Sequence, residues 1–273
     1  MLLLQRALGI LLVLATGPQA VRTVLGRCEV SNVAAKQFDL PDGLREVSGL
    51  ARGPGRTLLT HGDERGAITV LDAATLKVVR KVHLRGNPRD DFEGIAAAGD
   101  SVALMTSGGS LYFFRLGTAD TVPFTTVATG LALHCELEGL GWHRASGTML
   151  MPCKEPKGKA VPGLTVFRYR LGRAPGRIMP IVVQGSELAR VTGLAKVRAT
   201  GVEVDQVTGH LVVLSSRPAM LVEIDSTGRA VNAKALQPSR HPQSEGLTLT
   251  PDAIWIADEG TGRTGTLMRY ACR

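Results

Sequence analysis

The sequence predicts an all-β fold, a five-bladed β-propeller that is closed into a ring by a strand from the N-terminal part of the chain. Three observations support this prediction. A three-residue motif occurs five times at a nearly constant spacing, each copy is followed by a run of short strands, and the last run lacks one strand. Four short antiparallel strands in every ~45 residues are typical of propeller blades.

The repeated motif is a small or acidic residue followed by a glycine and an apolar residue. The five copies begin at Ser48, Glu93, Glu138, Thr200 and Glu245, and successive copies are 45, 45, 62 and 45 residues apart. Regular spacing predicts one structural unit per copy. The longer interval places extra residues in the third blade. We assign these residues to the stretches KEPKGKAVPG and RAPGRIMPIVVQGSELARV, whose sequences indicate no particular role.

The segments between the motifs have the alternating or β-branched apolar pattern of strands. In the fourth repeat, GVEVD, HLVVLSS, MLVEID and RAVNAKAL are separated by the turn sequences QVTG, RPA and STG. The first repeat continues with TLLTHGDE, AITVLD and KVVRKVHL, and the second with SVALMTS, SLYFFRL and PFTTVAT. Each repeat therefore predicts one blade.

The fifth repeat supplies only three strands, EGLTLT, AIWIAD and TLMRYACR. Because closed β folds leave no unpaired edge, we expect a strand within CEVSNVAAKQFDL to complete this blade. Ring closure of this kind brings Cys28 beside Cys272 and predicts a disulfide between them. Cys135 and Cys153 flank a hairpin and form the second predicted pair.

The first residues, MLLLQRALGILLVLATGPQA, predict a secretory signal peptide over residues 1–20, with residues 21–273 as a single propeller domain. The apolar run is shorter than the ~20 residues that a spanning helix needs, so we expect no stable membrane span. Four cysteines in an exported chain favour disulfides. We expect a periplasmic or secreted monomer.

Composition and motifs exclude several functional classes. The net charge is +8, but no basic block with interleaved aromatic residues indicates a nucleic-acid partner. The chain contains no G-x-S-x-G, H-E-x-x-H, Cys-x-x-Cys or phosphate-binding glycine motif. Whether the protein is an enzyme stays open.

Acidic residues gather on one predicted face of the ring. In a propeller, the start of each first strand and the loop between the second and third strands share a face. That face receives twelve of the 24 acidic residues: Glu46, Asp63, Glu64, Asp90, Asp91, Glu93, Glu136, Glu138, Glu155, Glu245, Asp258 and Glu259. Crowded carboxylates repel one another, and their oxygen atoms suit Ca²⁺. The alternative is that each glutamate only accepts backbone hydrogen bonds from the neighbouring blade.

Four other side chains on this face are candidates for contact with an anionic substrate. Lys154 and Arg65 stand beside acidic residues, and His61 and His241 could be bases or ligands. Simple ion pairs and solvated histidines are the alternative interpretations.

The segments EVSGLA, DFEGIA, ELEGLGW, TGVEVDQVTGHLVVLSS and QSEGLTLTPDAIWIADE occur in this order. On these segments, from Leu44 to Tyr270, the chain resembles the SdiA-regulated proteins, exported bacterial proteins similar to NHL-repeat and phytase-like propellers. The resemblance implies five blades and bound calcium, but no established reaction. By position it implies the ligands Glu93, Glu138, Glu155, Glu245 and Glu259. The second blade departs from the family, because TSGG stands where an acidic loop is expected.

Two functions are compatible with these observations. The first is an exported, calcium-binding propeller that binds a small molecule, a glycan or a protein without catalysis. The alternative is a calcium-dependent hydrolase of phosphoesters or lactones, in which the metal polarises the substrate and Lys154 or Arg65 neutralises its charge. A fully protein-ligated ion would favour the first function, and an ion with open positions would favour the second.

Overall fold

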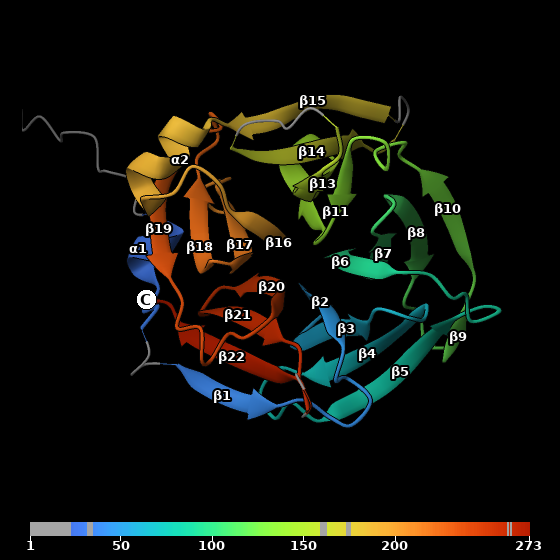
Figure 1. The fold of residues 1–273 in the computed structure, drawn as a ribbon. Helices are drawn as coiled ribbons and strands as arrows, with labels where there is room; N and C mark the ends of the chain where they lie inside the picture. The colour runs from blue at the N-terminus through green and yellow to red at the C-terminus, as the bar shows by residue number, and fades with distance from the viewer. Residues whose placement is uncertain (1–22, 32–34, 159–162, 173–175, 261, 263) are drawn as a thin grey trace, which may run out of the picture.

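The protein is a five-bladed β-propeller (Figure 1). A computed structural model describes residues 23–31, 35–158, 163–172, 176–260, 262 and 264–273 of the 273-residue chain. The predicted signal peptide lies outside the described residues. Among the helices of the described segments, none is long and apolar enough to cross a membrane.

The successive strands of each blade pair antiparallel, and the first strand lies next to the central axis. Blade 1 contains β2 (Val47–Arg52), β3 (Thr57–Gly62), β4 (Ala67–Asp72) and β5 (Val78–Leu84). Blade 2 contains β6 (Phe92–Ala98), β7 (Ser101–Thr106), β8 (Ser110–Arg115) and β10 (Phe124–Ala128). The predicted strands of both repeats are confirmed. The short strand β9 (Thr121–Val122) was not predicted, and it pairs in parallel with β5 of the preceding blade.

The third blade has an interrupted inner strand. Both β11 (Cys135–Leu137) and β12 (Gly141–His143) pair with β13 (Thr148–Pro156), and the 3-10 helix η1 (Arg144–Ser146) joins β12 to β13. The outer strands are β14 (Leu164–Arg170) and β15 (Gly176–Val183). Helix α2 (Gly185–Thr192) follows them. Of the two stretches that the sequence assigned to the extra residues, residues 159–162 and 173–175 lie outside the described residues. The described part contains the end of β13, strand β15 and most of α2, a helix that the strand pattern did not predict.

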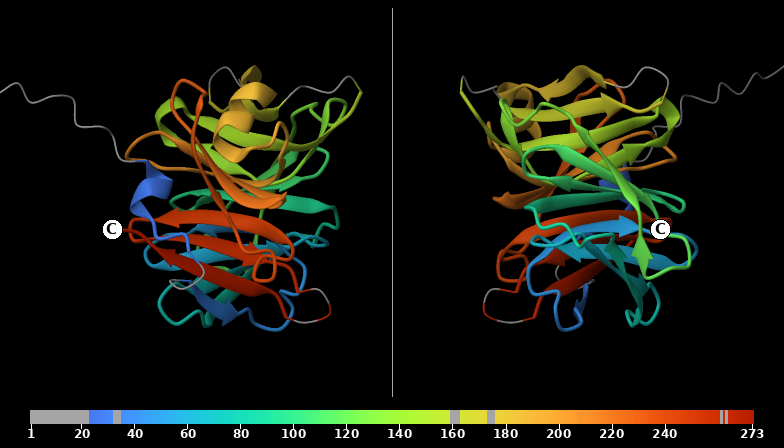
Figure 2. Two further views of the ribbon diagram at one scale, coloured as in Figure 1. Left: turned by 60° about the vertical axis from the view of Figure 1, so that its left-hand side comes forward. Right: turned by 90° about the vertical axis from the view of Figure 1, so that its right-hand side faces the viewer.

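Blades 4 and 5 complete the ring. Blade 4 contains β16 (Arg198–Val204), β17 (Leu211–Arg217), β18 (Ala219–Ile224) and β19 (Ala230–Ala235). Blade 5 contains β20 (Ser244–Thr250), β21 (Ala253–Asp258), β22 (Thr266–Ala271) and the N-terminal strand β1 (Lys36–Asp39). In Figure 2 the blue N-terminal segment lies beside the red C-terminal strands. The predicted closure is confirmed.

Two disulfides join the segments for which the sequence predicted them. Cys28 is bonded to Cys272, and Cys135 to Cys153. Cys28 follows helix α1 (Val24–Arg27), which packs on blade 4, where the Glu223 carboxylate accepts hydrogen bonds from two backbone N–H groups of the helix. The N-terminal segment therefore contacts blade 4 through α1 and blade 5 through the Cys28–Cys272 disulfide and β1.

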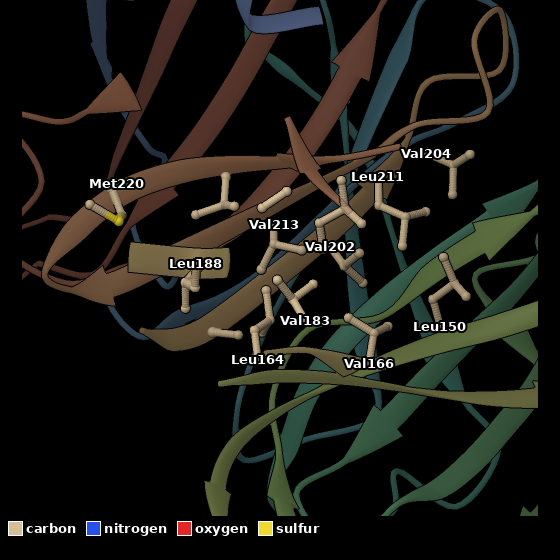
Figure 3. Close-up of a cluster of buried hydrophobic side chains, with 14 residues drawn as sticks. Leu150, Leu164, Val166, Val183, Leu188, Val202, Val204, Leu211, Val213 and Met220 are labelled. Atoms are coloured by element: carbon tan, nitrogen blue, oxygen red, sulfur yellow. The ribbon is translucent and has the colours of Figure 1, made fainter. Parts of the chain in front are cut away.

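Five buried apolar clusters hold the blades together, one at each boundary between neighbouring blades. Figure 3 shows the cluster between blades 3 and 4, in which Leu150 and Val166 from one blade face Val202 and Val213 from the other. Leu188 of α2 covers the outer part of this cluster. Alternate residues of each strand face these boundaries, which explains the period of two in the sequence.

The inner strands approach one another closely at the axis. A Cβ atom at Gly94 would lie 2.7 Å from the backbone of Gly139, and one at Gly139 would lie 2.5 Å from the Cα of Gly201. Gly139 also has a φ of +81°, which favours glycine over any other residue. The glycine of the motif is therefore explained by close packing of the inner strands.

Candidate metal centre at the channel mouth

The first residues of the five motifs form a ring around the axis on one face of the propeller. We call this side, with the starts of the inner strands, the upper face, and the opposite side the lower face. Around the ring the five positions hold Ser48, Glu93, Glu138, Thr200 and Glu245. Blades 2, 3 and 5 contribute carboxylates and blades 1 and 4 contribute hydroxyls. The repeat therefore places three glutamates at one mouth of the channel.

The three carboxylates lie within ligand distance of a shared point. Each of Glu93, Glu138 and Glu245 offers one oxygen atom, and these atoms all lie within 4.8 Å of one another. Glu138 is fully buried and Glu245 is 8% exposed, whereas Glu93 is less buried. The interruption between β11 and β12 places Glu138 outside the strand pairing of its own blade. We call these three residues the glutamate cluster.

Below the glutamate cluster the channel is nearly filled. A cavity of about 10 Å³ remains among the inner-strand residues, and Glu245 lines it. This space holds at most one water molecule. A ligand therefore reaches the cluster from the upper face and not through the ring.

Few hydrogen-bond donors surround the glutamate cluster. The Ser48 hydroxyl lies 2.9 Å from Oε2 of Glu93 and 3.2 Å from Oε2 of Glu245, but its single proton serves one of them at a time. Gln243 donates to Oε1 of Glu245 at 3.3 Å and also to Glu259. Most of the carboxylate oxygens in the cluster therefore lack a full set of donors.

Among the described residues, one side-chain cation contacts the glutamate cluster. The Lys154 ammonium group pairs with Oε2 of Glu138 and lies 3.4 Å from Oε1 of Glu136. Among the described residues, Oε1 of Glu138 has no hydrogen-bond partner, although it is fully buried. An unpaired buried oxygen is costly, so this atom indicates a missing partner.

Burial and mutual repulsion favour the protonated forms of these carboxyls. Burial, followed by repulsion from Glu245, raises the pKa of Glu93 to about 8 and that of Glu138 to about 9. Burial also raises the pKa of Glu245. Burial alone would lower the pKa of Lys154, but the neighbouring glutamates reverse this effect and raise it. At neutral pH, ionised carboxylates at this site therefore require a further positive charge.

The cluster has the charge and atom types for a divalent cation. Three ionised carboxylates and one ammonium group carry a formal charge of −2, which one Ca²⁺ would neutralise. All candidate ligand atoms are oxygens, as Ca²⁺ prefers, and three carboxylates supply at most six of its six to eight ligands. The residues present therefore fit calcium, and they leave room for further ligands from water or a bound molecule.

The other two predicted metal ligands lie outside the glutamate cluster. Glu259 lies beside the cluster and accepts a hydrogen bond from the Gln243 side chain. Burial, followed by repulsion from Glu245, raises the pKa of Glu259 to about 7. Glu155 is 60% exposed and lies 3.6 Å from Nε of Arg198. Within the described residues, Glu259 is thus a neighbour of the cluster, and Glu155 faces a different part of the surface.

The predicted anion contacts are dispersed. Lys154 contacts the glutamate cluster, whereas Arg65 lines a separate cavity of about 550 Å³ at the edge of blade 1. His61 is fully buried, and burial lowers its pKa to about 4. His241 is also buried, with Asp258 at 2.9 Å and the Tyr270 hydroxyl at 2.6 Å from its ring nitrogens. The two histidines therefore belong to the interior of the blades.

Two polar neighbours of the cluster were not singled out from the sequence. Ser48 begins the first copy of the motif, so its position in the repeat was sufficient to place it beside the glutamates. Gln243 lies two residues before a motif glutamate, and nothing in its local pattern marks it.

Comparison with known proteins supports the fold and assigns a family model. The model described as SdiA-regulated matches residues 34–261. The glutaminyl cyclase of Myxococcus xanthus is 14% identical, with 88% of this chain and 97% of that chain covered and a TM-score of 0.60. The PQQ-bound aldose sugar dehydrogenase of Streptomyces coelicolor is also 14% identical, with 89% and 99% covered and a TM-score of 0.52. A search of curated proteins found no match.

Proposed function

The chain belongs to the SdiA-regulated family, and on this premise we propose that it is an exported calcium-binding propeller that binds its ligand at the upper mouth of the channel. The observation that carries the proposal is the glutamate cluster, in which three carboxylates lie together and a buried oxygen of Glu138 has no hydrogen-bond partner among the described residues. A bound Ca²⁺ would supply the missing positive charge. The fold alone does not identify a function, because propellers support many.

The proposed location rests on the disulfides. Both cysteine pairs are oxidised, and stable disulfides are typical of exported proteins. We therefore propose a periplasmic or secreted protein, in agreement with the signal peptide expected from the sequence.

The proposed ligand is a small molecule, a glycan or a protein segment that carries oxygen atoms. Since the three glutamates supply at most six ligands, the remaining calcium positions would accept an oxygen of the bound molecule. Lys154, which is 18% exposed beside the cluster, would attract an anionic group to the same place. In this function the channel mouth recognises a ligand without transforming it.

The alternative is calcium-dependent hydrolysis of a phosphoester or a lactone, and it is favoured by the same open ligand positions. A bound calcium ion would polarise the substrate oxygen or activate a water molecule. The protein residues would orient the substrate, with Lys154 neutralising its negative charge and the filled channel restricting it to the upper face.

A calcium titration tests the proposal. We expect the melting temperature of residues 21–273 to rise with Ca²⁺ above its value in EGTA, and to rise far less with Mg²⁺. At one hundred times Kd the gain would be about 2.7 kcal/mol, and each kcal/mol corresponds to about 2–4 °C for a chain of this size.

Two glutamine variants locate the effect. Glu138→Gln should abolish the rise, because it removes a ligand, whereas Glu203→Gln should keep it, because Glu203 lies at the opposite mouth. No calcium-dependent shift in the wild type, together with no metal in the purified protein, would refute calcium binding. If calcium binds, release of phosphate or opening of a lactone ring would separate the hydrolase from the binding protein.

A further inference from the structure

A second polar cavity on the upper face lies between blades 3 and 4. Its volume is about 140 Å³, well above the ~10–15 Å³ that one water molecule needs. Four cationic side chains line it, together with one glutamate and one threonine: Lys154, Lys196, Arg198, Arg217, Glu155 and Thr165. Since Lys154 is paired with Glu138, the other charged residues leave the cavity with a formal charge of +2.

The cations of this cavity are held close together by the sheet. Arg198 and Arg217 are register partners on the neighbouring strands β16 and β17. Like charges directly opposite each other on antiparallel strands are destabilising. Glu155 compensates only in part, because its Oε2 lies 3.6 Å from Nε of Arg198 and its side chain is 60% exposed. The arrangement therefore lacks a negative charge.

Two buried donors at this cavity also lack hydrogen-bond partners within the described residues. Thr165 is 4% exposed, and among the described residues its hydroxyl makes no hydrogen bond. In the same part of the chain, the buried Nε atom of Arg198 makes none either. Both residues line the cavity. A hydroxyl without an acceptor and a guanidinium N–H that faces Glu155 only at 3.6 Å, beyond hydrogen-bond distance, lie beside the same cavity, and together they indicate an acceptor with several oxygen atoms.

We propose that this cavity binds a phosphate-type oxyanion, either free or as a monoester. Arg198 and Arg217 present guanidinium groups, which match the geometry of phosphate oxygens, and Lys196 adds a third positive charge. Thr165 donates its hydroxyl to one oxygen. The site uses none of the three residues of the glutamate cluster, and Lys154, which lines the cavity, is paired with Glu138, so we expect phosphate to bind with or without calcium.

The test is titration of the protein with inorganic phosphate by calorimetry at constant ionic strength, in EGTA and again in calcium. We expect saturable binding at one site under both conditions. Lys196→Gln and Arg217→Gln should each weaken binding at least tenfold. Lys234→Gln is the matched control, because it removes the same charge from an exposed position on β19 and should bind as the wild type does.

Thr165→Val separates binding from folding. Because the hydroxyl has no partner within the described structure, its removal should not lower the melting temperature in phosphate-free buffer, yet it should weaken phosphate binding severalfold. Titration with phenyl phosphate distinguishes a monoester site from one restricted to free phosphate. Equal binding by the wild type and Lys196→Gln, or no saturable binding in either buffer, would overturn the proposal.

Discussion

The channel has carboxylates at both mouths, but their surroundings differ. At the lower mouth, the two oxygens of Glu203 accept hydrogen bonds from the Val204 backbone N–H at 2.8 Å and the Thr248 hydroxyl at 3.0 Å. At the upper mouth, Glu138 is contacted by the Lys154 ammonium group and has an oxygen without a partner. Burial raises the pKa of Glu203 to about 7 and that of Glu138 to about 9.

This difference separates a structural carboxylate from a candidate ligand. Hydrogen bonds to an ionised carboxylate favour the charged form, so each donor near Glu203 opposes the effect of burial. At the glutamate cluster, repulsion between the glutamates adds to the effect of burial. Burial alone is therefore a poor indicator of a metal site, whereas a shortage of donors around crowded carboxylates is a better one.

Removal of the compensating cation should give the largest effect. Lys154→Met leaves the glutamate cluster without its ammonium group, so we expect the free energy of unfolding to fall by about 3 kcal/mol in EGTA at pH 8. Arg52→Met is the control, because Arg52 is an exposed cation near Glu203. Urea unfolding measures both variants, and equal small losses would show that the two mouths do not differ in their need for charge.

The pH dependence of stability should show an intermediate effect at the lower mouth. The pKa of Glu203 is raised to about 7 in the folded protein. The protonated carboxyl therefore contributes its full stabilisation of the folded state below pH 4.5, and this stabilisation is lost as the pH rises through about 7. Glu203→Gln stays neutral and avoids this loss. Arg52 and Arg144 are the other charged groups that line the same cavity.

Between pH 5 and pH 8, we therefore expect the wild type to lose stability relative to Glu203→Gln. One pKa unit is worth about 1.4 kcal/mol, and partial exposure of the side chain reduces our expectation for the whole effect to about 2 kcal/mol. Urea unfolding in EGTA at both pH values measures it. A constant difference between the two proteins would contradict the titration of Glu203.

The smallest effects should come from the hydroxyl donors. Ser48→Ala at the upper mouth and Thr248→Val at the lower mouth each remove a donor to a carboxylate, and each should cost about 1 kcal/mol in EGTA. Calcium should reduce the cost at Ser48, because the cation takes over the same oxygens, and leave the cost at Thr248 unchanged. Thermal unfolding with and without calcium compares them, and an equal response at both positions would contradict a site at one mouth only.

The repeat predicted most of the fold, because strand alternation and motif spacing are local properties of the chain. The missing strand of the fifth repeat predicted β1, and ring closure then predicted the pairing of Cys28 with Cys272. The helix α2 was missed because it lies in the insertion, where the spacing gives no guide. The parallel strand β9 was missed because it leaves its own blade.

The candidate site was predicted in part. The motif brought Glu93, Glu138 and Glu245 together, since equivalent positions of a ring converge at the axis. The orientation of Glu155 could not be predicted, because it depends on Arg198 from the next blade. The state of His61 depends on burial between blades, which local sequence does not report.

The closing strand sets an order of events during synthesis. Strand β1 is synthesised before the five inner strands, and its partner β22 is synthesised after all of them. Strand β1 therefore has no pairing partner from its own blade until the rest of the chain has been made. Cys135 and Cys153 are 18 residues apart and can pair as soon as blade 3 has been made. Cys28 and Cys272 are 244 residues apart, and their pairing requires the finished chain. Oxidation of this second pair can therefore follow only after the last strand has been made, and it fixes covalently a ring that the pairing of β1 with β22 closes.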